Sequence, residues 1–197
     1  MLSPAEIATF RRAERARLLA WRRALSPGDV AAASEAIVKR LQGLLPPHLP
    51  ATVASYWPLE GELDLTALLP WLRARGCTIV LPVVEEPRAP LVFRRYDAEA
   101  PLERSPFGIW EPRTSDVLTP TVLLVPMVAY DASCQRLGHG GGYYDRTLAL
   151  LPSAMTIGCA YEASELPTIH PLPHDQPLSA VVTETRTLLR PATRPPG

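Results

Sequence analysis

Hydrophobic residues follow two different spacings along this chain. Near the N-terminus they recur every three or four positions, which predicts an amphipathic helix over residues 4–24 that begins at a Ser-Pro pair. A second Ser-Pro pair at residues 26–27 predicts another helix, and the proline-rich stretch at residues 46–50 is expected to end it.

The rest of the chain alternates short apolar runs with helical segments. Six runs with β-branched or aromatic content and Pro or Gly boundaries predict strands. These runs are residues 52–57, 78–84, 91–96, 122–129, 155–161 and 180–183. Helices are predicted between them at residues 65–75 and 143–151, so the expected fold is an α/β layered sandwich, a mainly parallel sheet flanked by helices. Ligands of such sheets bind beyond the carboxyl ends of the strands.

A glycine-rich stretch follows the predicted strand at residues 122–129. Residues 136–146 read Arg-Leu-Gly-His-Gly-Gly-Gly-Tyr-Tyr-Asp-Arg. Glycines let backbone N–H groups converge on a phosphate, and Asp145 could hold the divalent cation that accompanies a nucleotide. The stretch has no Lys-Ser or Lys-Thr, and Tyr143 replaces the last glycine of a dinucleotide loop, so neither a Walker loop nor a dinucleotide-binding Rossmann domain is indicated. A glycine-rich surface turn with two packed tyrosines is the alternative.

The composition mainly argues against certain partners and certain kinds of site. The 197 residues are 47% hydrophobic, and we expect one domain over residues 1–190 with a flexible tail at residues 191–197. Basic and acidic residues both number 20, so neither nucleic acid nor a membrane is indicated as a partner. Three scattered cysteines argue against a disulfide framework or a zinc site. Without a membrane-spanning run or a secretory signal, we expect a cytoplasmic monomer that acts on small molecules.

Several side chains outside the glycine-rich stretch could bind a ligand. Arg11, Arg15 and Arg22 lie along one edge of the first helix, where they either reach over a cleft or form a solvated flank. Trp57 could stack on a flat heteroaromatic ring and Glu62 could accept its N–H donors, although Trp57 in the core and Glu62 or Asp64 as a helix cap are equally open.

Two features near the C-terminus and two proline-rich connections complete the candidates. Asp175 is a second carboxylate suited to Mg²⁺ beside Asp145. The His170 and His174 pair is not expected to form a helical metal site, because prolines lie between them. Residues 87–90 and 101–120 are either lids over a site or irregular connections. No serine or cysteine stands in a nucleophile setting, so positioning and charge neutralisation are the expected means of catalysis.

Residues 125–131 and 136–145 together resemble the central signature of the 5-formyltetrahydrofolate cyclo-ligase family, also called methenyltetrahydrofolate synthetase. That signature has a Val-Pro pair, an aromatic-Asp pair and Arg-Leu-Gly before a glycine loop that ends Tyr-Tyr-Asp. Further matches lie, in the expected order, at the two arginines of the first helix, the Glu62 segment, residues 107–112 and Asp175.

The resemblance implies that 5-formyltetrahydrofolate and MgATP give 5,10-methenyltetrahydrofolate, ADP and phosphate. ATP would phosphorylate the formyl oxygen, and N10 would then close the ring as phosphate departs. The alternatives are a catalytically silent relative that binds folate or nucleotide, and a sugar-phosphate isomerase or CoA-transferase on a similar fold.

The resemblance also implies residue roles. The catalytic residues would be Arg136, Tyr143 and Asp145. ATP would be held by Arg11, Arg15, Arg136, Leu137, Gly138, His139, Gly140, Gly141, Gly142, Tyr143 and Tyr144. The folate would contact Trp57, Glu62, His139, Gly140, Gly141, Gly142 and Tyr143, and Mg²⁺ would be bound by Asp145 and Asp175.

Four positions depart from the family pattern. His139 stands where an arginine is common, and we expect it to be largely neutral at pH 7 unless a phosphate raises its pKa. Arg11 replaces a common lysine and keeps the charge. Cys134 and Met127 occupy positions where glycine is common, and we expect altered turn geometry there.

Overall fold

The structure is a computed structural model that describes residues 2–45, 51–98, 101–106 and 108–191. The α-helices are α1 (Pro4–Arg23), α2 (Pro27–Leu44), α3 (Leu69–Arg73) and α4 (Tyr143–Leu150), and the 3-10 helices are η1 (Thr66–Leu68) and η2 (Glu162–Ser164). The strands are β1 (Thr52–Ala54), β2 (Thr78–Val83), β3 (Val92–Arg95), β4 (Leu102–Arg104), β5 (Trp110–Pro112), β6 (Val122–Pro126), β7 (Ala129–Tyr130), β8 (Arg136–Leu137), β9 (Met155–Cys159), β10 (Ala180–Val182) and β11 (Thr187–Leu189).

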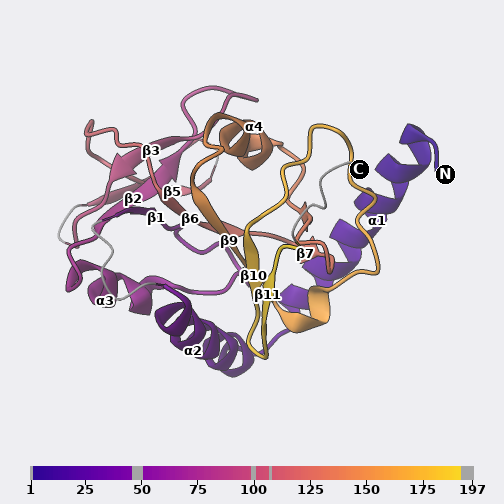
Figure 1. Cartoon of the computed structure of the whole chain (residues 1–197), viewed down its shortest axis with the longest axis horizontal. Coiled ribbons are helices and arrows are strands. Elements are labelled where there is room, and N and C mark those ends of the chain that lie inside the picture. Colours follow the sequence, from indigo (N-terminus) through magenta and orange to yellow (C-terminus); the bar gives the residue numbers. More distant parts are fainter. Residues whose placement is uncertain (1, 46–50, 99–100, 107, 192–197) are drawn as a thin grey trace.

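A seven-stranded sheet forms the centre of the protein, in the order β11-β10-β9-β6-β1-β2-β3 (Figure 1). The five inner strands run parallel, whereas β3 and β11 pair antiparallel at the two edges. The predicted α/β fold with a mainly parallel sheet is therefore confirmed. Two small antiparallel pairs, β4 with β5 and β7 with β8, lie outside this sheet.

Helices cover both faces of the sheet because its inner strands are apolar on both sides. In β6, Leu124 packs in one cluster with Ile37 of α2 and residues of α3, whereas Leu123 packs in another with Leu148 of α4. Figure 1 shows α2 and α3 along one side of the sheet and α4 on the other.

Helix α1 lies at the end of the sheet rather than over a face (Figure 1). It begins with a capping box, in which the Ser3 hydroxyl accepts from Glu6 N and the Glu6 carboxylate accepts from Ser3 N. Its buried Leu18 packs with Val128 and Ile169, so α1 is fixed against the region that follows β6.

The sequence predictions differ from the structure in several segments, and the short strands β8 and β11 were not predicted. The helix expected at residues 65–75 is a 3-10 turn followed by the five-residue α3. The strand expected at residues 122–129 stops at Pro126, and β7 is a separate strand. Residues 101–120 contain the β4–β5 pair, which was not predicted. The predicted breaker at residues 46–50 and residues 192–197 of the predicted tail lie outside the described residues.

The described ranges also bear on two absences expected from the sequence. No helix in them has the length and hydropathy needed to cross a membrane. Cys77, Cys134 and Cys159 are all buried, and no disulfide joins any described residues.

Candidate active site

A cavity of about 950 Å³ opens at the carboxyl ends of the central strands. Strand β1 is flanked by β2 on one side and by β6 on the other, and the chain visits these two sides in succession, so the strand order reverses between β1 and β6. Such a switch point leaves a crevice between the two connections. Tyr56 and Trp57 after β1, Val84 after β2 and Pro126 at the end of β6 all line the cavity.

The glycine loop, residues 138–142, forms one wall. The β7–β8 pair turns the chain back and delivers Arg136 and Leu137 to the cavity. Gly140 and Gly142 have φ angles of 101° and 67°, which side-chain-bearing residues rarely adopt. A Cβ on Gly141 would lie 2.7 Å from the ring of Tyr143. The loop conformation therefore requires these glycines.

Two arginines fix the loop through its carbonyl groups. Arg15 Nε donates to Gly138 O at 2.7 Å, and Arg146 Nη2 donates to Gly141 O at 2.6 Å. Within the described part of the chain, the backbone N–H groups of residues 138–142 donate to no acceptor. Helix α4 begins directly after the loop, so its first N–H groups and its positive end add to an arrangement suited to phosphate.

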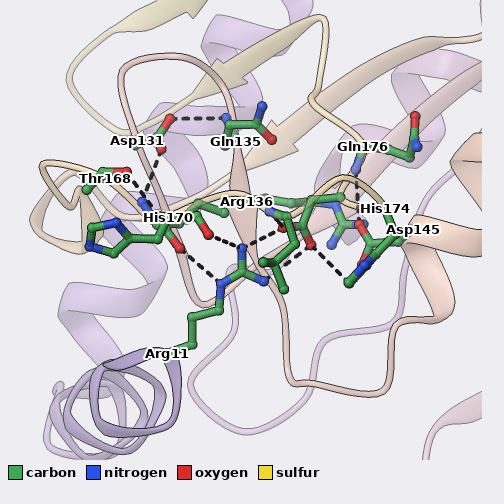
Figure 2. A network of polar contacts seen from close by, with 12 residues as sticks. Arg11, Asp131, Gln135, Arg136, Asp145, Thr168, His170, His174 and Gln176 are labelled. Atoms are coloured by element: carbon green, nitrogen blue, oxygen red, sulfur yellow. Dashed lines mark hydrogen bonds and ion pairs between the residues drawn. The ribbon is translucent and has the colours of Figure 1, made fainter. Parts of the chain in front are cut away.

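Two arginine–carboxylate pairs line the cavity and belong to the polar network of which Figure 2 shows a part. Arg136 Nη2 donates to Asp145 Oδ1 at 2.6 Å, and Arg11 Nη2 donates to Asp175 Oδ2 at 2.5 Å. Arg11 is held further by the carbonyls of Ile169, at 3.0 Å from Nε, and His170, at 2.8 Å from Nη2. Arg11 therefore joins α1 to the segment that contains Asp175.

The pKa of Asp175 reflects this pairing. Burial acts to raise it, but hydrogen bonds from Arg11 and from Leu172 N outweigh burial and hold the pKa below its ordinary value. Asp175 is therefore a carboxylate at neutral pH.

Asp131 supports the same segment from the side away from Arg11, as Figure 2 shows. Its Oδ1 accepts from the backbone N–H groups of Ser133 and Gln135 at 3.0 and 3.3 Å. Its Oδ2 accepts from Ile169 N at 3.2 Å, next to the carbonyl that holds Arg11. The aromatic-Asp pair of the sequence signature thus orders the turn that places Arg136 and the residue that places Arg11.

The residues considered for a flat ring, Trp57 and Glu62, also line the cavity. Trp57 packs edge-to-face on Tyr96 at 5.9 Å between centroids, and one part of it faces the cavity. Glu62 is buried, its Oε2 accepts from Leu59 N at 3.0 Å, and its Oε1 lies 3.7 Å from His139 Nε2. Asp64, not Glu62, accepts from Thr66 N at the start of η1. Glu62 is therefore a buried carboxylate at the cavity and not a helix cap.

His139 places a titratable group at the edge of the glycine loop. Burial lowers its pKa, the Arg22 and Arg15 charges lower it further, and Glu62 opposes these effects. The imidazole is consequently neutral at pH 7 in the ligand-free protein.

Every residue given a site role from the sequence lines this one cavity. Arg22 does not: it is 3% exposed and donates to the carbonyls of Met127 and Val128. Both proline-rich connections reach the cavity, through Arg88 in one and Trp110 in the other. Arg88, Trp110 and Arg146 were given no role from the sequence, because no local motif connects them.

Two of the positions that depart from the family pattern have distinct environments. Cys134 has a φ of 58°, in the left-handed region where glycine is favoured. Met127 packs tightly on β9, because a Cβ on Gly158 would lie 1.9 Å from Met127 Cε.

The two predicted metal ligands differ in their freedom to bind Mg²⁺. Asp145 Oδ1 accepts from Arg136 and from Gln176 N, whereas Oδ2 accepts from none of the described residues. Both oxygens of Asp175 accept from Arg11. The described ranges contain no cluster of three or more His, Cys, Asp or Glu side chains that would enclose a metal. This donor set fits Mg²⁺ that keeps waters and binds phosphate oxygens, with Asp145 as the more available ligand.

The fold and the cavity define a class: an α/β protein with a glycine loop, arginines and carboxylates that line one cavity at the switch point of its sheet. The sequence model of the 5-formyltetrahydrofolate cyclo-ligase family matches residues 8–184. The cyclo-ligase of Escherichia coli K12 is 34% identical over 173 residues, which cover 84% of this chain and 95% of that one. The cyclo-ligase of Haemophilus influenzae is 33% identical over 149 residues, covering 70% and 80%.

The solved structures agree. The 5,10-methenyltetrahydrofolate synthetase of Aquifex aeolicus superposes with a TM-score of 0.79 at 30% identity, covering 95% of this chain and 96% of the other. The chain belongs to the 5-formyltetrahydrofolate cyclo-ligase family.

Proposed function

We propose that this protein cyclises 5-formyltetrahydrofolate to 5,10-methenyltetrahydrofolate with hydrolysis of ATP to ADP and phosphate. The family membership supports this reaction, and one observation makes it the best fit to the site. A phosphate-type loop, two arginine–carboxylate pairs and a wall containing Trp57 and Glu62 share one cavity of about 950 Å³. A cavity of this size suits two co-substrates side by side.

The nucleotide lies, in this proposal, along the glycine loop. The N–H groups of residues 138–142 and Arg15 bind phosphate oxygens, and the Arg11 and Arg136 charges offset the charge that develops during transfer. Mg²⁺ would be held by Asp145 and, less directly, by Asp175, and would neutralise the phosphates. Tyr143 and His139 then lie between the nucleotide and the folate.

The folate binds, in this proposal, against the part of the cavity lined by Trp57 and Glu62. Trp57 stacks on the pterin, and Glu62 accepts hydrogen bonds from its N–H groups. The formyl oxygen attacks the γ-phosphorus and ADP leaves; N10 then attacks the formyl carbon, loses its proton, and phosphate departs. The chain's contribution is to align the three reacting atoms and to exclude water from the phosphorylated intermediate.

The setting of this reaction is also part of the proposal. Residues 1–190 act as one domain, and the protein works as a cytoplasmic monomer. Its zero formal net charge supports a role without nucleic acid or membrane partners.

Absorbance in the methenyl-folate band tests the reaction. The protein is mixed with 5-formyltetrahydrofolate and Mg²⁺, with and without ATP, and ADP is quantified in parallel. Product that requires ATP and matches ADP one to one is expected. Binding of both ligands without product would instead identify a silent binding relative, and turnover of another substrate without ATP would favour an isomerase or transferase.

A further inference from the structure

The cavity is lined by more arginine side chains than the proposed phosphate site requires. Five arginines line it, against three carboxylates. Arg11 and Arg136 are paired with Asp175 and Asp145, and Arg15 holds the glycine loop. Arg88 and Arg146 have no carboxylate partner among the described residues, although both line the cavity. Arg88 has no place in the reaction described above, and Arg146 contributes to it only through its hydrogen bond to Gly141 O in the glycine loop.

The turn that carries Arg88, residues 85–90, is tied at both ends. Before the turn, Val84 N donates to Glu111 Oε1 at 3.1 Å, and Glu111 is the neighbour of Trp110 in β5. After the turn, Leu91 N donates to Thr147 Oγ1 at 2.8 Å, and Thr147 is the neighbour of Arg146 in α4. These two hydrogen bonds join the turn that carries Arg88 to β5 and to α4, the elements that contain Trp110 and Arg146.

Arg88 has a charge that nothing in the described protein neutralises. Its side chain makes no hydrogen bond or ion pair with any described residue, and its backbone has a φ of 62°, unusual for a residue with a side chain. Of the two acids in the turn, Glu85 is paired with Arg94 at 3.0 Å, and Glu86 forms no ion pair with Arg88. The guanidinium group is consequently available to an anion from solution.

Arg146 is held in place and still has an unused donor. Its Nη2 donates to Gly141 O, and its guanidinium lies 5.4 Å from the centre of the Tyr143 ring. Its Nε is buried and has no hydrogen-bond partner among the described residues. A buried N–H without an acceptor is unfavourable, and a bound anion would remove that cost.

The surface between these arginines and the β5 strand is apolar. Trp110 is 41% exposed although it lines the cavity, and Ile109, Leu91 and Val84 line the same side. A flat ring that ends in anionic groups would match this combination of an exposed indole and two cationic side chains.

We propose that Arg88 and Arg146 form a subsite for the glutamyl carboxylates of the folate, with the p-aminobenzoyl ring packed against Trp110. This proposal rests on the proposed function, because it assigns the tail of the same substrate. Phosphate oxygens of ATP share the chemistry that these arginines recognise, so the test compares both ligands.

The deciding variant is Arg88→Gln, because Arg88 is exposed and supports no other contact. Dissociation constants are measured by fluorescence, without turnover, for 5-formyltetrahydrofolate, for 5-formyltetrahydropteroate, which lacks the glutamate, and for MgATP. We expect the variant to weaken binding of the glutamyl substrate by about tenfold, the loss typical of a charged hydrogen bond, and to leave the other two unchanged. Arg113→Gln, an exposed arginine outside the cavity that pairs with Glu103, is the matched control and is expected to change none of the three.

Three outcomes would overturn the subsite. Equally weaker binding of both folates would show that Arg88 does not contact the glutamate. Weaker binding of MgATP alone would assign Arg88 to the nucleotide. Unchanged binding of all three ligands also rejects it. Because these constants need no catalysis, failure of the wild-type protein to form methenyl product would reject the proposed function separately.

Discussion

Arg136 donates a 2.6 Å hydrogen bond to Oδ1 of Asp145 and leaves Oδ2 of that carboxylate without a partner among the described residues. The arginine, which has 4% of its side chain exposed, thus orients the carboxylate by one oxygen. The second oxygen is available to a cation at the start of α4.

Replacing Asp145 by Asn tests this arrangement. The amide keeps an oxygen for Arg136 but loses the negative charge, so we expect kcat at fixed Mg²⁺ to fall by about 100-fold and to recover partly at high Mg²⁺. Stopped assays over a Mg²⁺ series measure both effects, and thermal unfolding serves as the folding control. An unchanged Mg²⁺ dependence would remove Asp145 from the metal site.

The Arg11–Asp175 pair should contribute strongly to stability because both side chains are less than one-tenth exposed, at 9% and 8%. Arg11→Ala leaves a buried carboxylate unpaired, and we expect the free energy of unfolding to fall by about 3 kcal/mol. A double-mutant cycle with Asp175→Asn, followed by urea denaturation, measures the coupling. The Lys39–Glu35 pair, 70% and 68% exposed, is the control and should couple much more weakly, because solvent screens the two charges. Equal coupling in the two pairs would contradict the structure.

The same pair makes stability depend on pH in a defined direction. The folded-state pKa of Asp175 is lowered, so its stabilising contribution is complete above its ordinary value of 3.8 and is lost as the pH falls through the folded pKa. We expect wild type and Asp175→Asn to differ in unfolding free energy at neutral pH and to converge in acid. A difference that grows toward low pH would be inconsistent with a lowered pKa.

Met127 and Gly158 should behave as one packed unit. Gly158→Ala would place a methyl group 1.9 Å from Met127 Cε and 2.6 Å from Leu178 Cδ1, so we expect a loss of about 1–3 kcal/mol from overpacking. In a Met127→Ala background the same change should cost much less, because space has been created. Calorimetry of the four proteins checks this, and additive losses would mean that the two positions are independent.

His139→Arg should change the pH dependence of nucleotide binding. Because burial lowers the pKa of His139, the wild-type loop gains a positive charge only below its ordinary value of 6.5, and MgATP should bind more tightly as the solution is acidified. The arginine carries its charge throughout, so binding should be tighter at neutral pH and nearly independent of pH. Calorimetric titrations with MgATP between about pH 5.5 and pH 8 compare the two proteins. The same change of affinity with pH in both proteins would contradict this prediction.

Periodicity predicted the layered fold well because each main element has its own strong pattern. α1, α2 and α4 lie within about a residue of their predicted bounds, and the cores of the six predicted strands are present. The helix predicted at residues 65–75 is present only over residues 66–73, and its first turn is a 3-10 helix. Pro70 lacks an N–H group and stands at the start of α3, so the preceding turn is a separate 3-10 helix.

The sequence predicted the site less evenly. The glycine loop and Asp145 are contiguous, so a local motif could identify them. Arg22 shares the helix edge of Arg11 and Arg15, yet its guanidinium satisfies buried carbonyls at residues 127 and 128. A helical pattern gives the direction of a side chain but not what lies opposite it. Arg88 and Trp110 reach the cavity where Val84 N, just after β2, donates to Glu111 of β5, a long-range contact that no local signal encodes.

The contact between Arg11 and Asp175 spans 164 positions of the sequence. During synthesis, the first helix leaves the ribosome long before its partner exists, so this part of the cavity lining cannot assemble until residue 175 has emerged. The cleft is therefore among the last features that a newly made chain acquires. Any ligand that binds there stabilises the state in which Arg11 and Asp175 are in contact. Such a ligand therefore favours a late step of folding in addition to taking part in the reaction.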